Sequence, residues 1–197
     1  MRISPTRELA TDVVYFEDFL APEDADRYFR LLLETVVWRQ EEIRVFGKVH
    51  AFPRLTSWYG DKNAVYTYSG LRNTPMPWNA PLLELRARAE QASGTRFNSV
   101  LLNRYRSGND GMGWHADNER ELGRAPVIAS VSLGTPRLFV LRTQEEKRRL
   151  LELRLAHGSI LIMGGASQQN FQHAVPKEKR LVGERINLTF RTVLADK

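Results

Sequence analysis

Two segments of the chain repeat their apolar residues with the period of an amphipathic helix. The first predicted helix covers residues 22–38, and its apolar stripe consists of Tyr28, Leu32 and Val36. The second covers residues 80–92, where Asn79 is a suitable N-cap and Gly94 a suitable end. The pattern therefore places the helical part of the fold in the first half of the chain.

After residue 96 the chain consists of short apolar or alternating runs separated by turn residues, which is typical of strands. Strands are predicted over residues 97–106, 127–134, 137–143, 150–155, 158–163 and 185–194. The charged run 144–149 is expected to form a solvated hairpin loop, and the glycine-rich run 107–113 a flexible one. Many short strands at this spacing favour a sandwich, a barrel or a jelly roll.

Residues 40–78 mix aromatic residues, arginines, glycines and prolines with short strand-like runs, a pattern that indicates hairpins and not helices. Neither a repeat nor a low-complexity linker divides the sequence. We therefore expect one α+β domain over residues 1–197, with a distinct segment at about 40–78 and a strand-rich core at about 97–193.

Composition and charge indicate the cellular compartment of the chain and the kind of molecule that it binds. The 197 residues include no cysteine, which excludes disulfides, thiolate metal sites and cysteine nucleophiles and fits a reducing, intracellular setting, taken here as cytoplasmic. The first residues lack the apolar region of a secretory signal, and no apolar run is long enough for a membrane span. A formal net charge of +6 favours polyanionic partners, and the chain is expected to act as a monomer.

The most informative chemistry lies in a His-x-Asp motif, His115 and Asp117, directly after the glycine-rich run. Side chains at i and i+2 project from one face of a strand, and a third ligand can come from a distant strand. Two histidines and one carboxylate leave three positions of a metal open, as non-heme Fe(II) oxygenases require. His173 and His157 compete for the third position. We favour His173, because His157 precedes a strand at a turn, where a histidine often caps backbone groups.

The last predicted strand contains RINLTFR, which has one polar and one apolar face. The polar face consists of Arg185, Asn187, Thr189 and Arg191. Such a face points either to water or into a ligand-lined barrel, and both interpretations fit the sequence. Its two arginines suit a carboxylate, but they are separated by about 20 Å of strand, so they can share one small diacid only by reaching inward. Asn103 and Tyr105 share a face of an earlier strand and offer an amide and a phenol.

Together, these motifs resemble the AlkB family of Fe(II)/2-oxoglutarate-dependent dioxygenases. The resemblance is carried by NRYRSGNDGMGWHADNERELG, PVIASVSLG, LAHGSILIM, QHAVP and ERINLTFR, and upstream by VFGK, PRLTSWYGD and YTYSGL. It covers roughly residues 40–193 and is greatest to the nucleic-acid demethylases of the family. It implies a double-stranded β-helix, or jelly roll, with N-terminal helices and a nucleotide-recognition lid within residues 40–78.

The resemblance also implies the cofactors and the reaction. Fe(II) would be bound by His115, Asp117 and His173. Arg185 would hold the far carboxylate of 2-oxoglutarate, in a pocket completed by Asn103, Tyr105, Thr189 and Arg191. With O₂, the enzyme would convert 2-oxoglutarate to succinate and CO₂. It would also hydroxylate an N-methyl group on 1-methyladenine or 3-methylcytosine in DNA or RNA, which then leaves as formaldehyde, so that the damage is reversed directly.

Substrate contacts follow from the same resemblance. In relatives, the stretch matching VFGK probes the duplex, which implicates Phe46, Gly47 and Lys48. The stretch matching YTY lines the base pocket, which implicates Tyr66, Thr67 and Tyr68. Arg54 is a candidate for a phosphate contact, because a basic side chain positions a strand without reading its sequence. An extruded base also needs aromatic or apolar neighbours; Trp58 and Trp78 are instead interpreted as core residues.

One position departs from the family pattern and leaves the preferred lesion open. Relatives often have an acidic residue directly after the metal-binding aspartate, but here this residue is Asn118, and Glu119 is the nearest acidic side chain. Two other functions are compatible with parts of the sequence. One is a 2-oxoglutarate dioxygenase acting on a protein, lipid or metabolite, against which the VFGK and YTYSG stretches argue. The other is a catalytically silent jelly roll that only binds nucleic acid, against which the intact ligand set argues.

Overall fold

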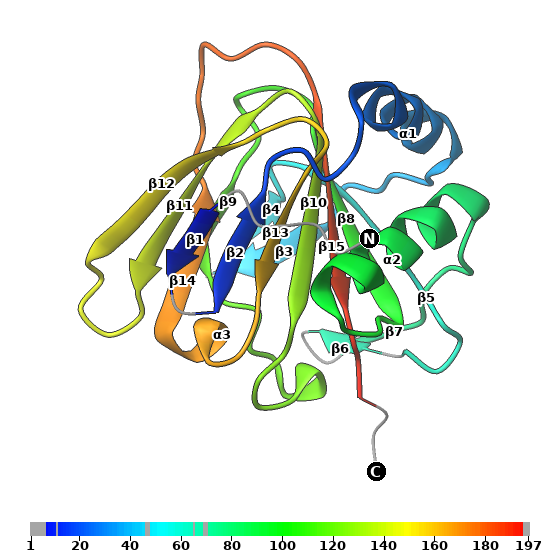
Figure 1. The fold of residues 1–197 in the computed structure, drawn as a ribbon. Coiled ribbons are helices and arrows are strands. Elements are labelled where there is room, and N and C mark those ends of the chain that lie inside the picture. Colours follow the sequence, from blue (N-terminus) through cyan, green and yellow to red (C-terminus); the bar gives the residue numbers. More distant parts are fainter. Residues whose placement is uncertain (1–6, 11, 46–47, 65, 69–70, 195–197) are drawn as a thin grey trace.

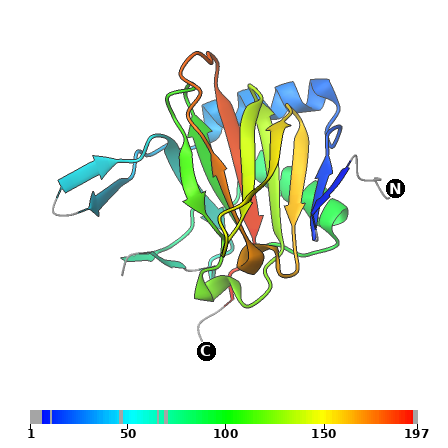
Figure 2. The same ribbon diagram turned by 90° about the vertical axis from the view of Figure 1, so that its left-hand side faces the viewer.

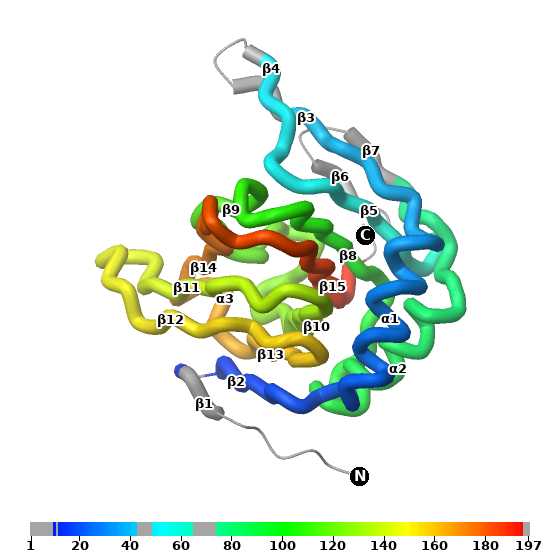
Figure 3. The backbone as a smooth tube through the Cα atoms, turned by 90° about the horizontal axis from the view of Figure 1, so that it is seen from above, coloured from blue at the N-terminus to red at the C-terminus, as the bar shows by residue number. Residues whose placement is uncertain are grey.

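The computed structural model describes residues 7–10, 12–45, 48–64, 66–68 and 71–194. Two antiparallel sheets face each other, and helices α1 (Pro22–Thr35) and α2 (Ala80–Ser93) lie against the outer face of the larger sheet (Figure 1). Figure 3 shows the same layers from above. The arrangement is the α+β jelly roll that the sequence predicts. In the described part of the chain, no helix is long and apolar enough to cross a membrane.

The larger sheet has the strand order β1-β2-β13-β10-β15-β8-β5. Its strands are β1 (Arg7–Ala10), β2 (Val13–Phe16), β5 (Leu55–Gly60), β8 (Ser99–Tyr105), β10 (Ile128–Gly134), β13 (Ser159–Met163) and β15 (Arg185–Arg191). The smaller sheet has the order β12-β11-β14-β9. Its strands are β9 (Met112–His115), β11 (Arg137–Thr143), β12 (Arg149–Leu155) and β14 (Phe171–Val175). Every strand predicted after residue 96 is therefore confirmed, with small changes at the ends.

Two hairpins extend from the body of the molecule near β5, as Figure 2 and Figure 3 show. They pair β3 (Glu42–Val45) with β4 (Lys48–Ala51), and β6 (Tyr66–Tyr68) with β7 (Leu71–Asn73). The hairpins predicted within residues 40–78 are thus confirmed. Between them, however, β5 pairs with β8 and so belongs to the larger sheet. The segment is therefore anchored in the jelly roll, a feature that the sequence did not reveal.

The helices begin and end largely as their sequence indicates. The Asn79 side chain accepts a hydrogen bond from the Leu82 amide at 3.1 Å, and Gly94 ends α2 with a positive φ of 69°. The first helix is shorter than predicted, because it ends at Thr35 and Val36 is already extended, with ψ 132°. β-Branched valines favour extended backbone at this point, and Arg39 then pairs with Thr56 of β5.

The core has two layers, and β15 separates them. Its apolar residues Ile186, Leu188 and Phe190 pack towards the helices, in the cluster that contains residues of α1 and α2. Its polar residues line a pocket on the opposite face, and all seven residues of the strand are buried. Of the two interpretations of this polar face, the one in which it points to the interior and not to water is therefore confirmed.

The glycine-rich loop between β8 and β9 makes many hydrogen bonds, a feature that the sequence does not reveal. The Asp110 carboxylate binds the backbone and the guanidinium of Arg106. Buried Arg137 of β11 donates to the carbonyls of Ser107, Asp110 and Pro176 at 2.8–3.1 Å. Arg137 thus gives these carbonyls the hydrogen-bond donors that a neighbouring strand would otherwise provide. These contacts hold the loop just before the segment that carries His115 and Asp117.

Candidate active site

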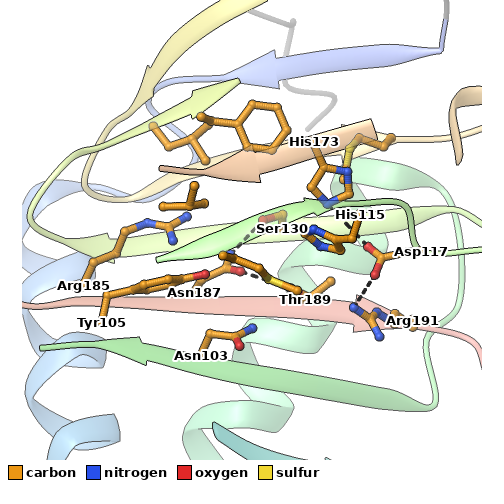
Figure 4. A pocket seen from close by; sticks show the side chains of 15 residues that line it. Asn103, Tyr105, His115, Asp117, Ser130, His173, Arg185, Asn187, Thr189 and Arg191 are labelled. Atoms are coloured by element: carbon orange, nitrogen blue, oxygen red, sulfur yellow. Dashed lines mark hydrogen bonds and ion pairs between the residues drawn. The ribbon is translucent and has the colours of Figure 1, made fainter. Parts of the chain in front are cut away.

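The structure brings His115, Asp117 and His173 together between the two sheets (Figure 4). His115 ends β9 and lies directly opposite His173 of β14 in the strand register. One potential ligand atom from each of the three residues lies within 4.8 Å of the others. This set of two imidazoles and one carboxylate is the metal-binding group that the sequence predicts, and it contains His173 and not His157.

One detail of the His-x-Asp motif differs from expectation. The strand β9 ends at His115, so Asp117 is not on a strand face with it. Instead, the backbone amide of Asp117 donates to the side-chain oxygen of Gln168 at 2.9 Å. Asp117 is 3% exposed, so this amide has no access to bulk water. Its position therefore depends on a side chain that lies 51 residues away in the sequence.

The two histidines are oriented by their neighbours. The Nδ1 of His115 lies 2.9 Å from the carbonyl of Gly113. Since a carbonyl can only accept, Nδ1 donates in this contact, and Nε2 is the ring nitrogen that can bind a metal. The ring of His173 is stacked on Phe139 at a centroid distance of 5.5 Å. The two imidazoles are only 4.2 Å apart between centroids, so both face the same small volume.

The charges of the group suit a divalent cation. Burial raises the pKa of the Asp117 carboxyl, but Arg191 and the two histidines lower it further, so the net shift is downwards. Burial, with a smaller contribution from His115, lowers the pKa of His173 from 6.5 to about 3. At neutral pH the carboxylate is ionised and His173 is neutral. These are the protonation states in which both residues bind a metal.

The two arginines of β15 have different environments at opposite ends of the pocket (Figure 4). Arg191 donates to the Asp117 carboxylate at 2.6 Å. Arg185 donates from Nη2 to Ser132 Oγ at 2.9 Å, while its Nε and Nη1 have no hydrogen-bond partner among the described residues. Burial lowers the pKa of Arg185, although Tyr105 partly opposes this effect. The two arginines therefore need not share one small diacid: Arg191 is engaged by Asp117, whereas two of the Arg185 donors, against one of Arg191 (Nε), have no partner among the described residues.

An inner pocket connects Arg185 with the metal-binding group. It is lined by all five residues predicted for the co-substrate: Asn103, Tyr105, Arg185, Thr189 and Arg191. The pocket is narrow, with a volume of about 30 Å³. Its floor is an ordered polar network, in which Asn187 donates to Ser130 Oγ at 2.7 Å and Thr189 donates to Asn187 Oδ1 at 3.1 Å.

A wider cleft of about 280 Å³ approaches the same group from the side of β5. The cleft and the inner pocket share Met112, His115, Asp117 and Arg191 in their walls. The remaining wall of the cleft includes Phe52, Arg54, Thr56, Trp58 and Glu119. Two cavities of different size and character therefore meet at the metal-binding group.

The residues predicted to contact substrate are distributed unevenly. Glu119 lies in the wall of the cleft, and its Oε2 is buried without a hydrogen-bond partner in the described structure, whereas Asn118 is exposed and is not part of the wall. Arg54 is 8% exposed and donates to Asn103 Oδ1 at 2.7 Å, which places it between the two cavities and away from an outer phosphate. Phe46 and Gly47 lie outside the described residues. For Lys48, Tyr66, Thr67 and Tyr68 the description covers only the backbone.

Other assignments from the sequence can also be placed. His157 accepts from the Gly134 amide at 2.7 Å and contacts Asp26 at 3.2 Å, so it caps backbone as expected. Trp78 packs against the helix-side cluster, while Trp58 packs against the cluster between the sheets and also lines the cleft. The interpretation of Trp58 as core alone was therefore incomplete.

Several site residues were not predicted from the sequence. Ser130 of β10 contacts Asn187, and Ser132 contacts Arg185. The sequence does contain a sign of this polar face, because two serines at i and i+2 interrupt an apolar run. Gln168 carries no such signal, since its partner is brought close only by the fold. The stacking of Phe139 on His173 is likewise a tertiary contact.

Comparisons with known proteins define the class of the chain. The 2OG-Fe(II) oxygenase superfamily matches residues 12–191. The solved structure of OsALKBH1 shares the fold, with a TM-score of 0.65 at 17% identity, covering 94% of this chain and 100% of that chain. With its metal-binding group between the sheets, the chain is thus an Fe(II)/2-oxoglutarate-dependent dioxygenase.

Closer relatives identify the family within this class. The mouse (Mus musculus) DNA oxidative demethylase ALKBH2 is 42% identical over 184 residues, covering 88% of this chain and 77% of the relative. The bovine (Bos taurus) alpha-ketoglutarate-dependent dioxygenase alkB homolog 3 is 41% identical over 187 residues, covering 90% of this chain and 65% of the relative. The chain belongs to the AlkB family of 2-oxoglutarate-dependent dioxygenases.

Proposed function

We propose that the protein is an oxidative demethylase of N-alkylated nucleic-acid bases, with alkylated DNA as the first candidate substrate and RNA as the second. The single observation that carries the proposal is that two cavities meet at His115 and Asp117, while His173 completes the metal-binding group from the inner pocket. A dioxygenase that uses 2-oxoglutarate must hold this co-substrate and the molecule to be oxidised at one metal, from different directions. The name of the mouse relative, a DNA oxidative demethylase, supports the choice of substrate.

The metal-binding group fits Fe(II). Two imidazoles and one carboxylate are nitrogen and oxygen donors of the kind that non-heme Fe(II) enzymes use. When bound, the iron would activate O₂ for the coupled oxidation of 2-oxoglutarate and of the substrate. Arg191 contributes by holding one Asp117 oxygen at 2.6 Å, which fixes the orientation of the carboxylate that would bind the iron.

The inner pocket fits the far carboxylate of 2-oxoglutarate. Arg185 is buried and its Nε and Nη1 donors have no partner among the described residues, an arrangement that is costly unless an anion binds there. Tyr105 and Thr189 add hydroxyl groups along the same wall. Because the pocket is narrow, a diacid of this size would move the lining side chains apart as it binds.

The wider cleft fits a base extracted from its strand. Its volume of about 280 Å³ is close to the roughly 300 Å³ at which small-molecule sites begin. It offers the aromatic ring of Phe52, the indole of Trp58 and the buried carboxylate oxygen of Glu119. Glu119 would accept a hydrogen bond from the exocyclic amino group of adenine or cytosine, in the place that Asn118 leaves open. From the resemblance to the family, Phe46 and Tyr66 would supply further contacts with the substrate.

The remaining parts of the proposal concern the setting. We place the protein in the cytoplasm, where its lack of cysteine causes no loss of stability, and expect it to act as a monomer. The test of the function is release of formaldehyde from methylated oligonucleotides by the wild-type protein and by E119M. E119M keeps the length of Glu119 but removes both acceptor oxygens, and it should slow demethylation of the base while 2-oxoglutarate affinity is unchanged. Formaldehyde release that E119M leaves unchanged would remove Glu119 from the substrate site.

A further inference from the structure

Gln168 lies in the short helix α3 (Ser167–Asn170), directly before the strand β14 that carries His173. Its side chain is 1% exposed, which is rare for an amide unless its hydrogen bonds are satisfied. Its Oε1 accepts the Asp117 amide at 2.9 Å, and its Nε2 lies 3.4 Å from Ser167 Oγ and 3.5 Å from the sulfur of Met163. Both polar atoms of this side chain therefore have partners in the surrounding structure.

The contact with Asp117 replaces a backbone hydrogen bond that the sheet does not make at this position. β9 pairs with β14 as far as His115, which faces His173, and the pairing stops there although β14 continues to Phe171. The amide of Asp117 therefore lies just beyond the ladder. Since a buried amide needs an acceptor, the oxygen of Gln168 supplies what the backbone carbonyl of a neighbouring strand would otherwise provide.

Gln168 and Arg191 hold Asp117 at two different points. Arg191 binds the carboxylate, at Oδ1, whereas Gln168 binds the backbone. The carboxylate contact alone leaves the main chain free to shift, because an aspartate side chain can follow the arginine by rotating. With the backbone also fixed, only a small range of positions is left for Oδ2, which lies 3.9 Å from His173 Nε2.

We infer that Gln168 is a positioning residue for the metal, acting through Asp117. This inference rests on the proposed role of Asp117 as a metal ligand. The side chain of Gln168 binds no ligand itself but sets the place from which the carboxylate projects. Groups that orient a metal ligand typically change metal affinity by about 10–100-fold when they are replaced.

The experiment measures Co²⁺ binding to the metal-free protein by calorimetry, together with its thermal unfolding. Q168M keeps the length of the side chain and removes the oxygen, so the dissociation constant for Co²⁺ should rise about 10–100-fold. Q168E keeps an oxygen at the same place and should restore most of the affinity. Q168N keeps the amide but withdraws it by one methylene, and should lose affinity as Q168M does. Q169M makes the matched change on the exposed neighbour and should bind as wild type does.

The outcomes separate this inference from the assignment of the metal site. Wild-type affinity in folded Q168M, an equal loss in Q169M, or no recovery in Q168E would each overturn the role of Gln168. Should Q168M fail to fold, the difference between Q168N and Q168E decides in the same way. D117A should lose Co²⁺ binding. If D117A instead binds Co²⁺ normally, the assignment of Asp117 as a metal ligand is wrong, and so is the inference about Gln168. If D117A loses Co²⁺ binding but Q168M binds Co²⁺ normally, only the inference about Gln168 is wrong.

Discussion

Replacing Arg185 by methionine should affect co-substrate affinity and protein stability in opposite directions. The guanidinium is 2% exposed, it donates one hydrogen bond to Ser132, and its Nε and Nη1 have no partner in the described residues. A buried charge without full pairing opposes folding. The same free donors are what would bind the carboxylate of 2-oxoglutarate.

The expected magnitudes follow from these contacts. A charge-assisted two-point contact with a carboxylate contributes roughly 1.5–3 kcal/mol, so R185M should weaken 2-oxoglutarate binding about 10- to 150-fold. Removing the desolvated charge should raise the free energy of unfolding of the metal-free protein by about 1 kcal/mol. In a domain of this size such a change raises the Tm by about 2–4 °C.

Arg137 offers a matched control, because it is a second buried arginine near the same aromatic ring. Arg137 and Arg185 lie 5.4 and 5.2 Å from the Tyr105 ring centroid, but Arg137 is paired with Glu178 and donates to three backbone carbonyls. R137M should therefore lower the Tm and leave the 2-oxoglutarate affinity of the folded protein unchanged. Calorimetry with Co²⁺-loaded protein and differential scanning calorimetry give both quantities. If R185M instead lowers the Tm and binds 2-oxoglutarate normally, Arg185 is a structural residue and the proposed pocket is wrong.

Three further predictions test other parts of the account. H157A should lose about 1–2 kcal/mol of stability, because the Gly134 amide loses its acceptor, but should keep Co²⁺ affinity and turnover. The pKa of His173 in the folded protein is about 3, below its usual 6.5, so as the pH falls the unfolded chain binds the proton before the folded chain does. Urea unfolding of the metal-free protein should therefore show the free energy of unfolding falling between pH 6.5 and about 4.5, by at most about 1.4 kcal/mol per pH unit. H173N should flatten this slope. F46A should impair demethylation of a lesion in a duplex and spare the same lesion in a single strand, since only the duplex requires an apolar wedge; equal losses would count against that role.

The features that could be predicted from the sequence are those set by local periodicity. Alternation along β15 separates Arg185 from Ile186 and so predicts one polar and one apolar face, and both faces are found. The N-cap at Asn79 and the end of α2 at Gly94 depend on neighbouring residues only, and both are confirmed. His173 could be preferred to His157 because each histidine has a distinct local setting.

The features that could not be predicted depend on contacts between distant segments. Nothing local distinguishes Arg185, with its free donors, from Arg191, which is bound to Asp117. Gln168 and Gln169 are adjacent and of the same residue type, yet Gln168 is buried against Asp117 and Gln169 is exposed. Arg54 looked like a surface cation, and its burial against Asn103 follows only from the pairing of β5 with β8.

The most direct test of the central claim is the simultaneous measurement of succinate and formaldehyde with Fe(II), O₂ and 2-oxoglutarate. The substrates are oligonucleotides that contain 1-methyladenine or 3-methylcytosine, and the controls are the unmethylated oligonucleotide and D117A. We expect formaldehyde in proportion to the methylated base repaired, with matching succinate, and neither product above background from D117A. Succinate without formaldehyde from either methylated base would contradict demethylation of nucleic acid and point to a protein, lipid or metabolite as the substrate.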